Sequence, residues 1–364
     1  MRIAVAVNEF PALSETFVLD QITGLLDRGH DVTVLAGLPR EAGLAHAAVQ
    51  RYGLLERTTY VPWHASLPRR WLPGGVASAR RFDAVLCHFG NVGRRMHRLR
   101  AAGYVEGPLA VVFHGFDVAM LPREQGPDYY APLFRDAELL LPISDAWQRA
   151  LVSLGAPAER TRVHHMGVDL ERFAFRARTR DADEPTRLLM IARLTEKKGV
   201  GDAIAAVARA DAALQLTIVG DGPLRAELEA QADERVTFLG WRDSDEVAQQ
   251  LAEAHILVQP SVTAADGDQE GIPVGIMEAM ACGLPVIATR HSGIPELVED
   301  GVSGRLVAER DVDALAAAMT DLAQAPASWD ALGRAGRARV DAAFNVAKLN
   351  DELVSILGSL ADVV

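Results

Sequence analysis

Short apolar segments alternate with helix-like segments along most of the chain, and the apolar segments have the length of β-strands. Continuous apolar runs of this kind suit strands that are buried on both faces of a parallel sheet. The first half also contains an amphipathic segment, Ser14–Arg28, which predicts a helix. The strands predicted in this half are Arg2–Val7, Asp31–Ala36, Ala84–Cys87, Leu109–Phe113 and Leu139–Ile143.

A polar, charge-rich segment at 174–186 interrupts this alternation, which then resumes. Strand and helix units in series imply parallel sheets with right-handed crossovers. We therefore predict an α/β protein with two facing Rossmann-like domains, 1–173 and 187–345, joined by a linker at 174–186. The second domain is expected to contain strands at Arg187–Ala192, Leu216–Val219, Val236–Leu239, Ile256–Val258 and Pro285–Ala288, and helices at Gly201–Ala210, Leu224–Ala232 and Val274–Ala281.

The composition is that of a globular protein, with 364 residues of which 49% are hydrophobic and 24% charged. A net charge of −12 argues against nucleic acid as a partner. Neither a long apolar run nor a signal-peptide pattern is present, which favours a cytoplasmic location. Cys87 and Cys282 lie far apart in apolar surroundings, and they suggest neither a disulfide framework nor a zinc site.

Positive charge is concentrated between residues 69 and 100, where a single acid, Asp83, stands among eight arginines. A basic face on an acidic protein can dock on anionic lipid headgroups, so peripheral contact with a membrane is one interpretation. A solvated face of the protein is the other. The arginines are Arg69, Arg70, Arg80, Arg81, Arg94, Arg95, Arg98 and Arg100.

Two carboxylates, Glu270 and Glu278, stand eight residues apart in the most informative segment of the chain. Pro273 is well placed at the start of a helix, so we expect Glu270 in a loop and Glu278 in the first turns of that helix. Gly271 and Gly275 leave the N–H groups of the helix N-terminus open to an anion. Acids beside an anion-receptive helix end suit a ligand with hydroxyls and phosphates, although helix capping alone also favours such acids.

Cations and glycines follow the first two predicted strands of the second domain. Arg193 and Lys198 come directly after a strand, where they could hold a diphosphate without a metal, or form a solvated basic turn. Gly220 and Gly222 resemble the start of a dinucleotide fingerprint, but the remainder of that pattern is missing, which leaves a tight turn as the alternative.

In the first domain, His114 ends an apolar strand, and the adjacent Gly115 leaves room for a ligand beside it. His88 has the same setting with less support, and a structural role is open for both histidines. The segment Asn8–Phe17 follows the first strand, where a phosphate could meet a helix N-terminus. It has no glycine, so Asn8, Ser14, Thr16 and backbone N–H groups would form this acceptor or phosphate loop, unless the segment serves only as a helix cap.

Several further motifs accompany these residues in a characteristic order along the chain. They are Phe238-Leu239-Gly240, Gly283-Leu284-Pro285-Val286, Gly293-Ile294-Pro295-Glu296, and His165-Met166-Gly167-Val168-Asp169 with Phe173. Together with Lys198-Gly199 and Glu270-Gly271-Ile272-Pro273, they make the chain resemble the GT-B glycosyltransferases of family 4, which are retaining nucleotide-sugar enzymes. The start, Phe10-Pro11 with Ser14-Glu15-Thr16-Phe17, resembles a bacterial exopolysaccharide-type subgroup.

This resemblance implies a role for each candidate residue. Arg193 and Lys198 would neutralise the donor diphosphate, Glu278 would bind the ribose, and Glu270 would contact the sugar and phosphate. His114 would contact the donor sugar from the other domain, and 346–364 would form a helix that crosses back to the first domain. The remaining donor-binding candidates are Gly271, Ile272, Pro273, Val274, Gly220, Gly222, Trp241 and Arg242.

The expected reaction transfers a hexose-type sugar from a nucleotide-diphosphate sugar to an acceptor hydroxyl, in polysaccharide, glycolipid or natural-product biosynthesis. The departing phosphate would take the acceptor proton, so no dedicated protein base is required. Asp266 and Asp268 are interpreted as a polar loop, and neither a metal nor a cofactor is expected. Three alternatives stay open: an epimerase of the same fold, a nicotinamide-dependent dehydrogenase, and a non-catalytic nucleotide-binding protein. The base, the sugar and the acceptor are not determined by the sequence.

Overall fold

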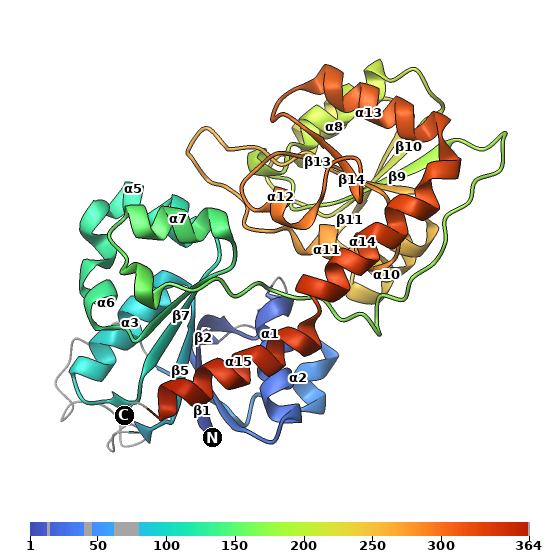
Figure 1. Ribbon diagram of the computed structural model, residues 1–364. Coiled ribbons are helices and arrows are strands. Elements are labelled where there is room, and N and C mark those ends of the chain that lie inside the picture. Colours follow the sequence, from blue (N-terminus) through green and yellow to red (C-terminus); the bar gives the residue numbers. More distant parts are fainter. Residues whose placement is uncertain (13–14, 40–45, 62–79, 363–364) are drawn as a thin grey trace. The chain divides into compact units, whose positions relative to one another are not determined.

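The computed structural model describes residues 1–12, 15–39, 46–61 and 80–362 (Figure 1). The chain divides into two compact units. Unit 1 consists of Met1–His165 and Val346–Val364, and unit 2 consists of Met166–Asn345.

Unit 1 is built on a six-stranded sheet in which every neighbouring pair of strands is parallel. Its order reverses between β1 and β5, because the chain first adds strands on one side of β1 and then on the other. In spatial order the strands are β3 (Thr58–Tyr60), β2 (Asp31–Pro39), β1 (Arg2–Phe10), β5 (Ala84–His88), β7 (Leu109–Phe113) and β8 (Leu139–Pro142). A separate pair joins β4 (Arg80–Arg81) to β6 (Val105–Glu106).

Helices pack on the sheet of unit 1, and the last helix of the chain is among them (Figure 1). Strands β1, β5 and β7 are fully buried over most of their length, as continuous apolar runs predict. The helices are α1 (Thr16–Asp27), α2 (Ala47–Arg51), α3 (Gly90–Ala101), α4 (Phe116–Ala119), α5 (Leu121–Gln125), α6 (Ala131–Asp136), α7 (Asp145–Ser153) and α15 (Val346–Ala361).

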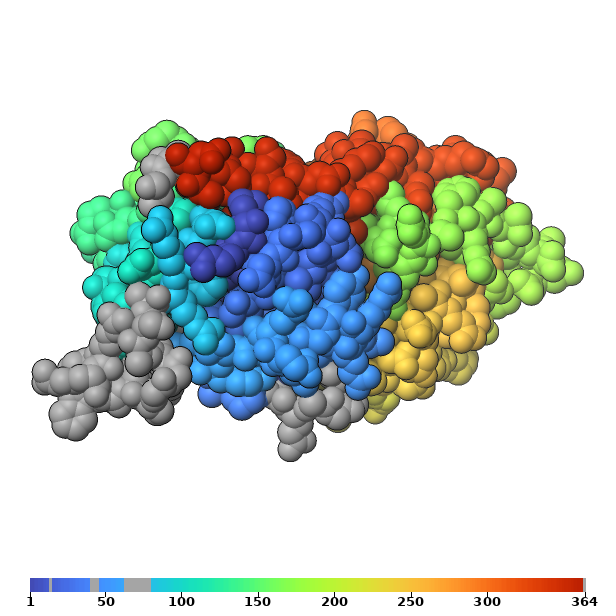
Figure 2. Space-filling view, turned by 90° about the horizontal axis from the view of Figure 1, so that it is seen from below, coloured from blue at the N-terminus to red at the C-terminus, as the bar shows by residue number. Residues whose placement is uncertain are grey.

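Helix α15 lies along α1, on the surface of unit 1 (Figure 2). The Asn350 amide donates to Asp20 O at 3.1 Å and occupies the space that a Cβ on Gly24 would need. Arg28 donates to Asp351 Oδ1 and to Ala347 O, both at 2.7 Å. The prediction that the C-terminal helix packs on the first domain is therefore confirmed.

Unit 2 repeats the same strand order, with its reversal between β9 and β12. All of its neighbouring strands are parallel as well. In spatial order the strands are β11 (Val236–Gly240), β10 (Leu214–Val219), β9 (Thr186–Ile191), β12 (Ile256–Gln259), β13 (Val286–Thr289) and β14 (Gly304–Val307). The helices are α8 (Val200–Arg209), α9 (Arg225–Gln231), α10 (Ser244–Glu253), α11 (Val274–Ala281), α12 (Ile294–Leu297), α13 (Val312–Gln324) and α14 (Trp329–Ala343).

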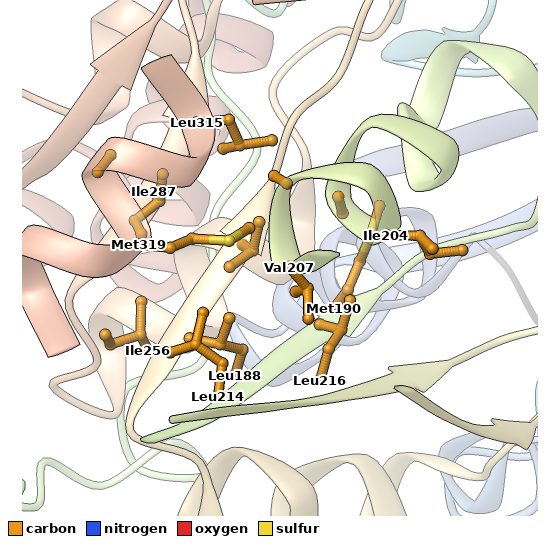
Figure 3. Close-up of a cluster of buried hydrophobic side chains, with 14 of the residues drawn as sticks. Leu188, Met190, Ile204, Val207, Leu214, Leu216, Ile256, Ile287, Leu315 and Met319 are labelled. Carbon is orange, nitrogen blue, oxygen red and sulfur yellow. The ribbon is translucent and has the colours of Figure 1, made fainter. Parts of the chain in front are cut away.

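A core of aliphatic side chains lies between this sheet and helices α8 and α13 (Figure 3). Met190 of β9, Val207 of α8 and Met319 of α13 are all fully buried in it. Burial of this much apolar surface supplies the main driving force for folding, and it fixes the strand ends on which the candidate residues stand.

The division between the units lies between His165 and Met166, whereas the sequence places it at 173. Hydrogen bonds attach the intervening segment to unit 2. Among them, Val168 N donates to Phe344 O at 2.9 Å, and Arg337 donates to Phe173 O at 2.6 Å. Within the expected linker, Arg178 is buried and donates to Cys282 O at 2.9 Å. The linker at 174–186 stays a prediction.

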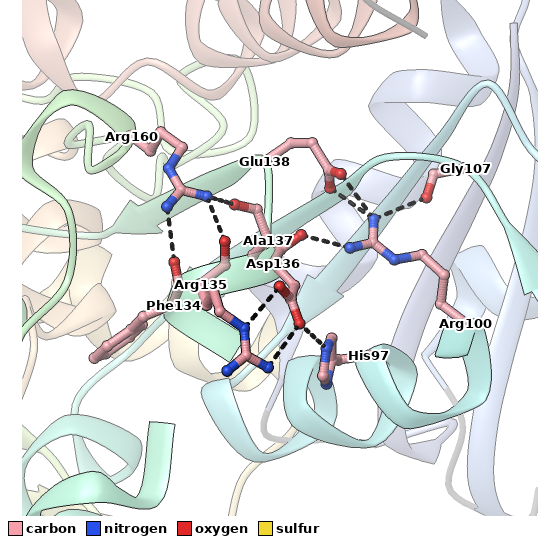
Figure 4. A network of polar contacts seen from close by, with 9 residues as sticks. All are labelled: His97, Arg100, Gly107, Phe134, Arg135, Asp136, Ala137, Glu138 and Arg160. Atoms are coloured by element: carbon pink, nitrogen blue, oxygen red, sulfur yellow. Dashed lines mark hydrogen bonds and ion pairs between the residues drawn. The ribbon is translucent and has the colours of Figure 1, made fainter. Parts of the chain in front are cut away.

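Several arginines of the basic stretch have partners inside unit 1, and Figure 4 shows those of Arg100. Arg100 donates to both carboxylate oxygens of Glu138, at 2.9 and 2.7 Å, and to Asp136 O at 2.5 Å. The guanidinium of Arg94 lies 4.1 Å from the ring centre of Tyr129. Part of the stretch therefore makes contacts within unit 1, which neither a membrane-docking face nor a solvated face anticipates, and membrane contact stays a prediction. Arg69 and Arg70 lie outside the described residues.

Among the residues that the structure describes, no helix has both the length and the apolar character that crossing a membrane requires.

Candidate active site

Cations stand at the carboxyl end of β9, beside the point where the strand order of unit 2 reverses. Doubly wound sheets bind their ligands at such points. Lys198 ends a short 3₁₀ turn (Glu196–Lys198), and Gly199 follows with a φ of 65°. A Cβ on Gly199 would approach Pro260 O to 1.8 Å, so only glycine allows the lysine turn to pack on the segment after β12.

Gly220 and Gly222 bring the end of β10 against the segment that carries Arg193. A Cβ on Gly220 would lie 1.9 Å from Ala192 O, and one on Gly222 would lie 2.5 Å from Leu194 O. Leu194 N also donates to Asp221 O at 3.0 Å. These two glycines therefore form a tight turn that packs against the segment of Arg193. Close approach of the two backbones explains why glycine stands at both positions.

Glu270, Lys197 and Lys198 form a partly buried cluster. Lys198 Nζ lies 2.8 Å from Glu270 Oε2, and Lys197 Nζ lies 3.6 Å from Glu270 Oε1 and 2.9 Å from Asp268 Oδ2. Glu270 is only 8% exposed. Burial works to raise its pKa, but the charges of Lys198 and Lys197 outweigh this effect and hold the pKa below its ordinary value. Glu270 is therefore an ionised carboxylate that orients two ammonium groups.

The helix predicted after Pro273 is α11, and its observed bounds match the predicted ones. Pro273 takes the cap position just before the helix, and Ile272 beside it is buried. Gly271, Val274 and Gly275 are half-buried around the helix N-terminus, and Glu278 is half-buried one turn further along. The structure thus places Glu270 in the loop and Glu278 on the helix.

His291 and Glu309, which the sequence pattern did not identify, support the Glu270 loop. His291 is 1% exposed, and its Nε2 lies 3.1 Å from Glu270 N. Its Nδ1 lies 2.6 Å from Glu309 Oε1. The nearby motif Gly293-Ile294-Pro295-Glu296 draws attention to this part of the chain, but no local pattern identifies Glu309 as a partner.

In unit 1, His114 and His88 stand at the carboxyl ends of neighbouring strands, β7 and β5. Their rings are stacked with centres 5.3 Å apart, and His88 Nδ1 lies 3.2 Å from His114 Nε2. The ring of Phe17 lies 4.7 Å from that of His114. Burial lowers the pKa of His88 to about 3 and that of His114 well below its ordinary value, so both rings are neutral near pH 7.

Asp117, which is fully buried, fixes the loop that carries His114. Its Oδ1 accepts from His114 N at 3.0 Å and from Gly115 N at 2.8 Å, and its Oδ2 accepts from Gly90 N at 2.8 Å. One carboxylate thus joins the end of β7 to the start of α3. No sequence pattern pointed to this role.

Asp117→Asn is expected to lower the free energy of unfolding by about 2 kcal/mol, because an amide nitrogen would then face the Gly90 N–H and leave it without an acceptor. Urea unfolding at pH 7.5 measures this change. Asp128→Ala, at an exposed position nearby, serves as the control and should leave the midpoint unchanged. Equal midpoints for Asp117→Asn and the wild type would contradict the role of Asp117 in joining β7 to α3.

The predicted acceptor loop needs a correction. Asn8 lies within β1, which continues to Phe10 because Glu9 and Phe10 pair with Leu38 and Pro39 of β2. The Asn8 side chain accepts from Arg95 of α3 at 2.5 Å. Thr16 begins α1, and Ser14 lies outside the described residues. The loop therefore begins after Phe10.

The remaining candidates stand on the surface of unit 2 or in the other unit. Trp241 is 53% exposed and Arg193 is also exposed, whereas Arg242 is half-buried. The structure brings Lys198 and Glu270 together directly, and it places His114 in unit 1. Within the described parts of the chain, no group of three His, Cys, Asp or Glu side chains could hold a metal ion.

Comparison with known proteins identifies the family. A family model described as glycosyltransferase family 4 matches residues 14–172, and one described as glycosyl transferases group 1 matches residues 185–325. The chain is 38% identical to the amylovoran biosynthesis glycosyltransferase AmsK of Erwinia amylovora, over 99% of this chain and 100% of that protein. The chain belongs to glycosyltransferase family 4.

This family-4 glycosyltransferase is also 37% identical to a putative colanic acid biosynthesis glycosyltransferase, WcaL, of Escherichia coli K12, over 99% of the chain and 100% of that protein. Among solved structures, HepE of Anabaena in complex with UDP-glucose has a TM-score of 0.77 at 22% identity, and the match covers 99% of this chain and 100% of HepE. A sucrose-phosphate synthase from Thermosynechococcus elongatus has a TM-score of 0.76 at 22% identity, over 100% of both chains. The GT-B fold predicted for the family-4 enzyme is thereby confirmed.

Proposed function

We propose that this family-4 glycosyltransferase transfers a hexose from a nucleotide-diphosphate sugar to a hydroxyl of an exopolysaccharide precursor, with retention of configuration. The observation that carries the proposal is the contact between Lys198 and the buried Glu270 at the strand reversal of unit 2. Two relatives of similar length, AmsK and WcaL, are named for exopolysaccharide biosynthesis. The HepE structures in complex with UDP and with UDP-glucose support a nucleotide-sugar donor.

In this proposal, the residues of unit 2 hold the donor. Lys198 and Arg193 bind the diphosphate, together with the N–H groups at the start of α11. Glu278 accepts from the ribose hydroxyls, and Glu270 contacts the sugar. Trp241 and Arg242 lie at the end of β11, where an exposed aromatic ring is available to a nucleobase. His114 of unit 1 contacts the sugar.

The bond between the sugar and the phosphate breaks first, and its electron pair goes to the departing diphosphate. The oxygen of the acceptor hydroxyl then bonds to the anomeric carbon from the same face, and its proton passes to the phosphate. Cations and helix N–H groups that are already in place stabilise the charge on the diphosphate as it develops. These reaction steps use no protein base. Glu270 is then free to serve as an anion that contacts two lysines.

The donor class can be tested by binding. A thermal-shift panel of UDP-, GDP- and ADP-sugars is expected to raise the melting temperature with members of one nucleotide class, because a ligand at 100 times its Kd stabilises the folded state by about 2.7 kcal/mol. The matching donor should then release its nucleotide only when an acceptor is present. Release or conversion without an acceptor would indicate an epimerase, and binding without any turnover would indicate a non-catalytic protein.

A further inference from the structure

A buried histidine, His291, links the Glu270 loop to a second carboxylate. It follows β13 in a turn and is 1% exposed. Its Nε2 lies 3.1 Å from the backbone nitrogen of Glu270, and its Nδ1 lies 2.6 Å from Glu309 Oε1. Each ring nitrogen therefore has one partner, and the two partners come from different loops.

The chemistry of these partners determines where the ring carries its proton. A backbone N–H can only donate, so Nε2 must offer a lone pair to Glu270. Nδ1 then carries the hydrogen and donates it to Glu309. The other oxygen of Glu309 accepts from Thr263 N at 2.8 Å, which orients the carboxylate. Burial works to raise the pKa of Glu309, and its hydrogen bonds from Thr263 and His291 outweigh this effect, so the pKa lies below its ordinary value.

The same region also connects to the lysine turn. Arg310, next to Glu309, donates to Glu196 Oε1 at 3.0 Å and to Thr263 O at 2.9 Å. Val262 N donates to Lys197 O at 2.9 Å. The lysine turn, the Glu270 loop and the turn after β13 are therefore held against one another through polar contacts, with His291 at their buried centre.

We propose that His291 is a positioning residue for the donor site: its neutral ring, with the proton on Nδ1, holds the Glu270 backbone so that the carboxylate stays on Lys198. A second proton on the ring would leave two donors, and Nε2 could then no longer accept from Glu270 N–H. The donor-binding consequence rests on the proposed function, whereas the backbone contact does not.

Several charged groups surround this ring. Glu309 faces Nδ1, and the carboxylate of Glu270 lies on the residue that Nε2 contacts. Lys197 and Lys198 lie beyond Glu270. All four groups are retained when residue 291 alone is changed. A difference in behaviour between the wild type and such a variant therefore reports on residue 291.

Two amide variants separate the two ring nitrogens. The side-chain amide of His291→Gln reaches the position of Nε2, where its oxygen can accept from Glu270 N–H. The shorter side chain of His291→Asn reaches only the position of Nδ1, beside Glu309. Hydrogen exchange of the Glu270 amide in the donor-free protein is expected to stay near the wild-type rate in His291→Gln. In His291→Asn it should be about tenfold faster, the effect of losing about 1.4 kcal/mol.

Turnover provides the second readout. With the nucleotide-sugar that the wild type turns over in the panel above, donor KM is expected to rise about tenfold in His291→Asn and to stay near wild type in His291→Gln.

Equal exchange rates at Glu270 in His291→Asn and the wild type would overturn the proposal, as would equal loss in both amide variants. Thermal melting of each variant checks that it is folded. Because the exchange measurement needs no donor, it stands even if the nucleotide-sugar panel shows no turnover, and the two proposals fail separately.

Discussion

Replacing Lys198 by alanine is expected to lower kcat/KM for the donor by about 100- to 1,000-fold, the usual cost of removing one preorganised group that stabilises charge in a transition state. Its side chain is only 17% exposed, and its Nζ lies 2.8 Å from Glu270 Oε2. A charge held in partly water-excluded surroundings acts more strongly on a diphosphate than one in bulk water. The loss should appear mainly in kcat, because negative charge on the diphosphate grows as the bond breaks.

The remaining lysines of the chain provide matched controls. Lys348→Ala, on the exposed side of α15, should leave kcat/KM unchanged. Lys198→Arg keeps the charge but replaces a point-like ammonium by a planar fork, so it should recover only part of the activity. Lys197 stays 3.6 Å from the other oxygen of Glu270, so the carboxylate of Lys198→Ala keeps a cationic partner and the variant is expected to fold.

Steady-state kinetics with the donor from the panel, together with urea unfolding of each variant, make this measurement. Turnover near the wild-type rate in Lys198→Ala would contradict the diphosphate role. A loss of activity accompanied by unfolding would instead assign the lysine to stability, and Lys198→Arg, which retains the charge, distinguishes these two cases.

Local pattern was sufficient for the elements that carry the donor site. The bounds of β7 and α11 match their predictions, because an uninterrupted apolar run and a proline before a helix are signals that lie within the segment itself. Lys198 and Glu270 could be expected near each other, since both follow strands at the carboxyl edge of one sheet. The sequence could not show that they touch.

Contacts between distant polar residues account for what the sequence could not predict. The polar residues that follow Val7 predict a loop at Asn8. Pairing with β2 instead extends the strand through Phe10. Glu309 and Asp117 resemble any surface acids in the sequence, and only the fold brings them against His291 and Gly90. The arginines of the basic stretch likewise predict a basic surface of the protein, whereas Arg100 donates to Glu138 within unit 1.

Acidification from pH 7.5 to 5.0 is expected to lower the stability of unit 1 by about 4 kcal/mol through the buried His88 and His164 alone, and the buried His114 adds to this loss. Burial lowers the pKa of His88 to about 3 and that of His164 to about 4, from an ordinary value of 6.5. The folded state keeps both rings neutral, whereas the unfolded chain takes up protons below pH 6.5. Stability is therefore fully present above that pH and falls as the pH drops towards the folded-state values.

The size of the effect follows from linkage. A difference of one pKa unit corresponds to about 1.36 kcal/mol, so each histidine contributes about 2 kcal/mol between pH 6.5 and 5.0. Domains of this kind are stable by only about 5–15 kcal/mol, so such a loss is large. Carboxylates with a lowered pKa, such as Glu270, act mainly below their ordinary value of 4.5 and contribute little in this window.

His164→Leu isolates one of the two histidines. Among the described residues, both ring nitrogens of His164 lack a hydrogen-bond partner, and its Nδ1 lies 3.9 Å from Glu352 of α15. An apolar side chain of similar size should therefore cost little at pH 7.5. Urea unfolding, monitored by hydrogen exchange of β5 and β7, is expected to show an acid-induced loss about 2 kcal/mol smaller in this variant than in the wild type. An equal loss in the variant and the wild type would mean that His164 takes up its proton while unit 1 is still folded. The buried ring would then contribute nothing to the loss of stability in acid.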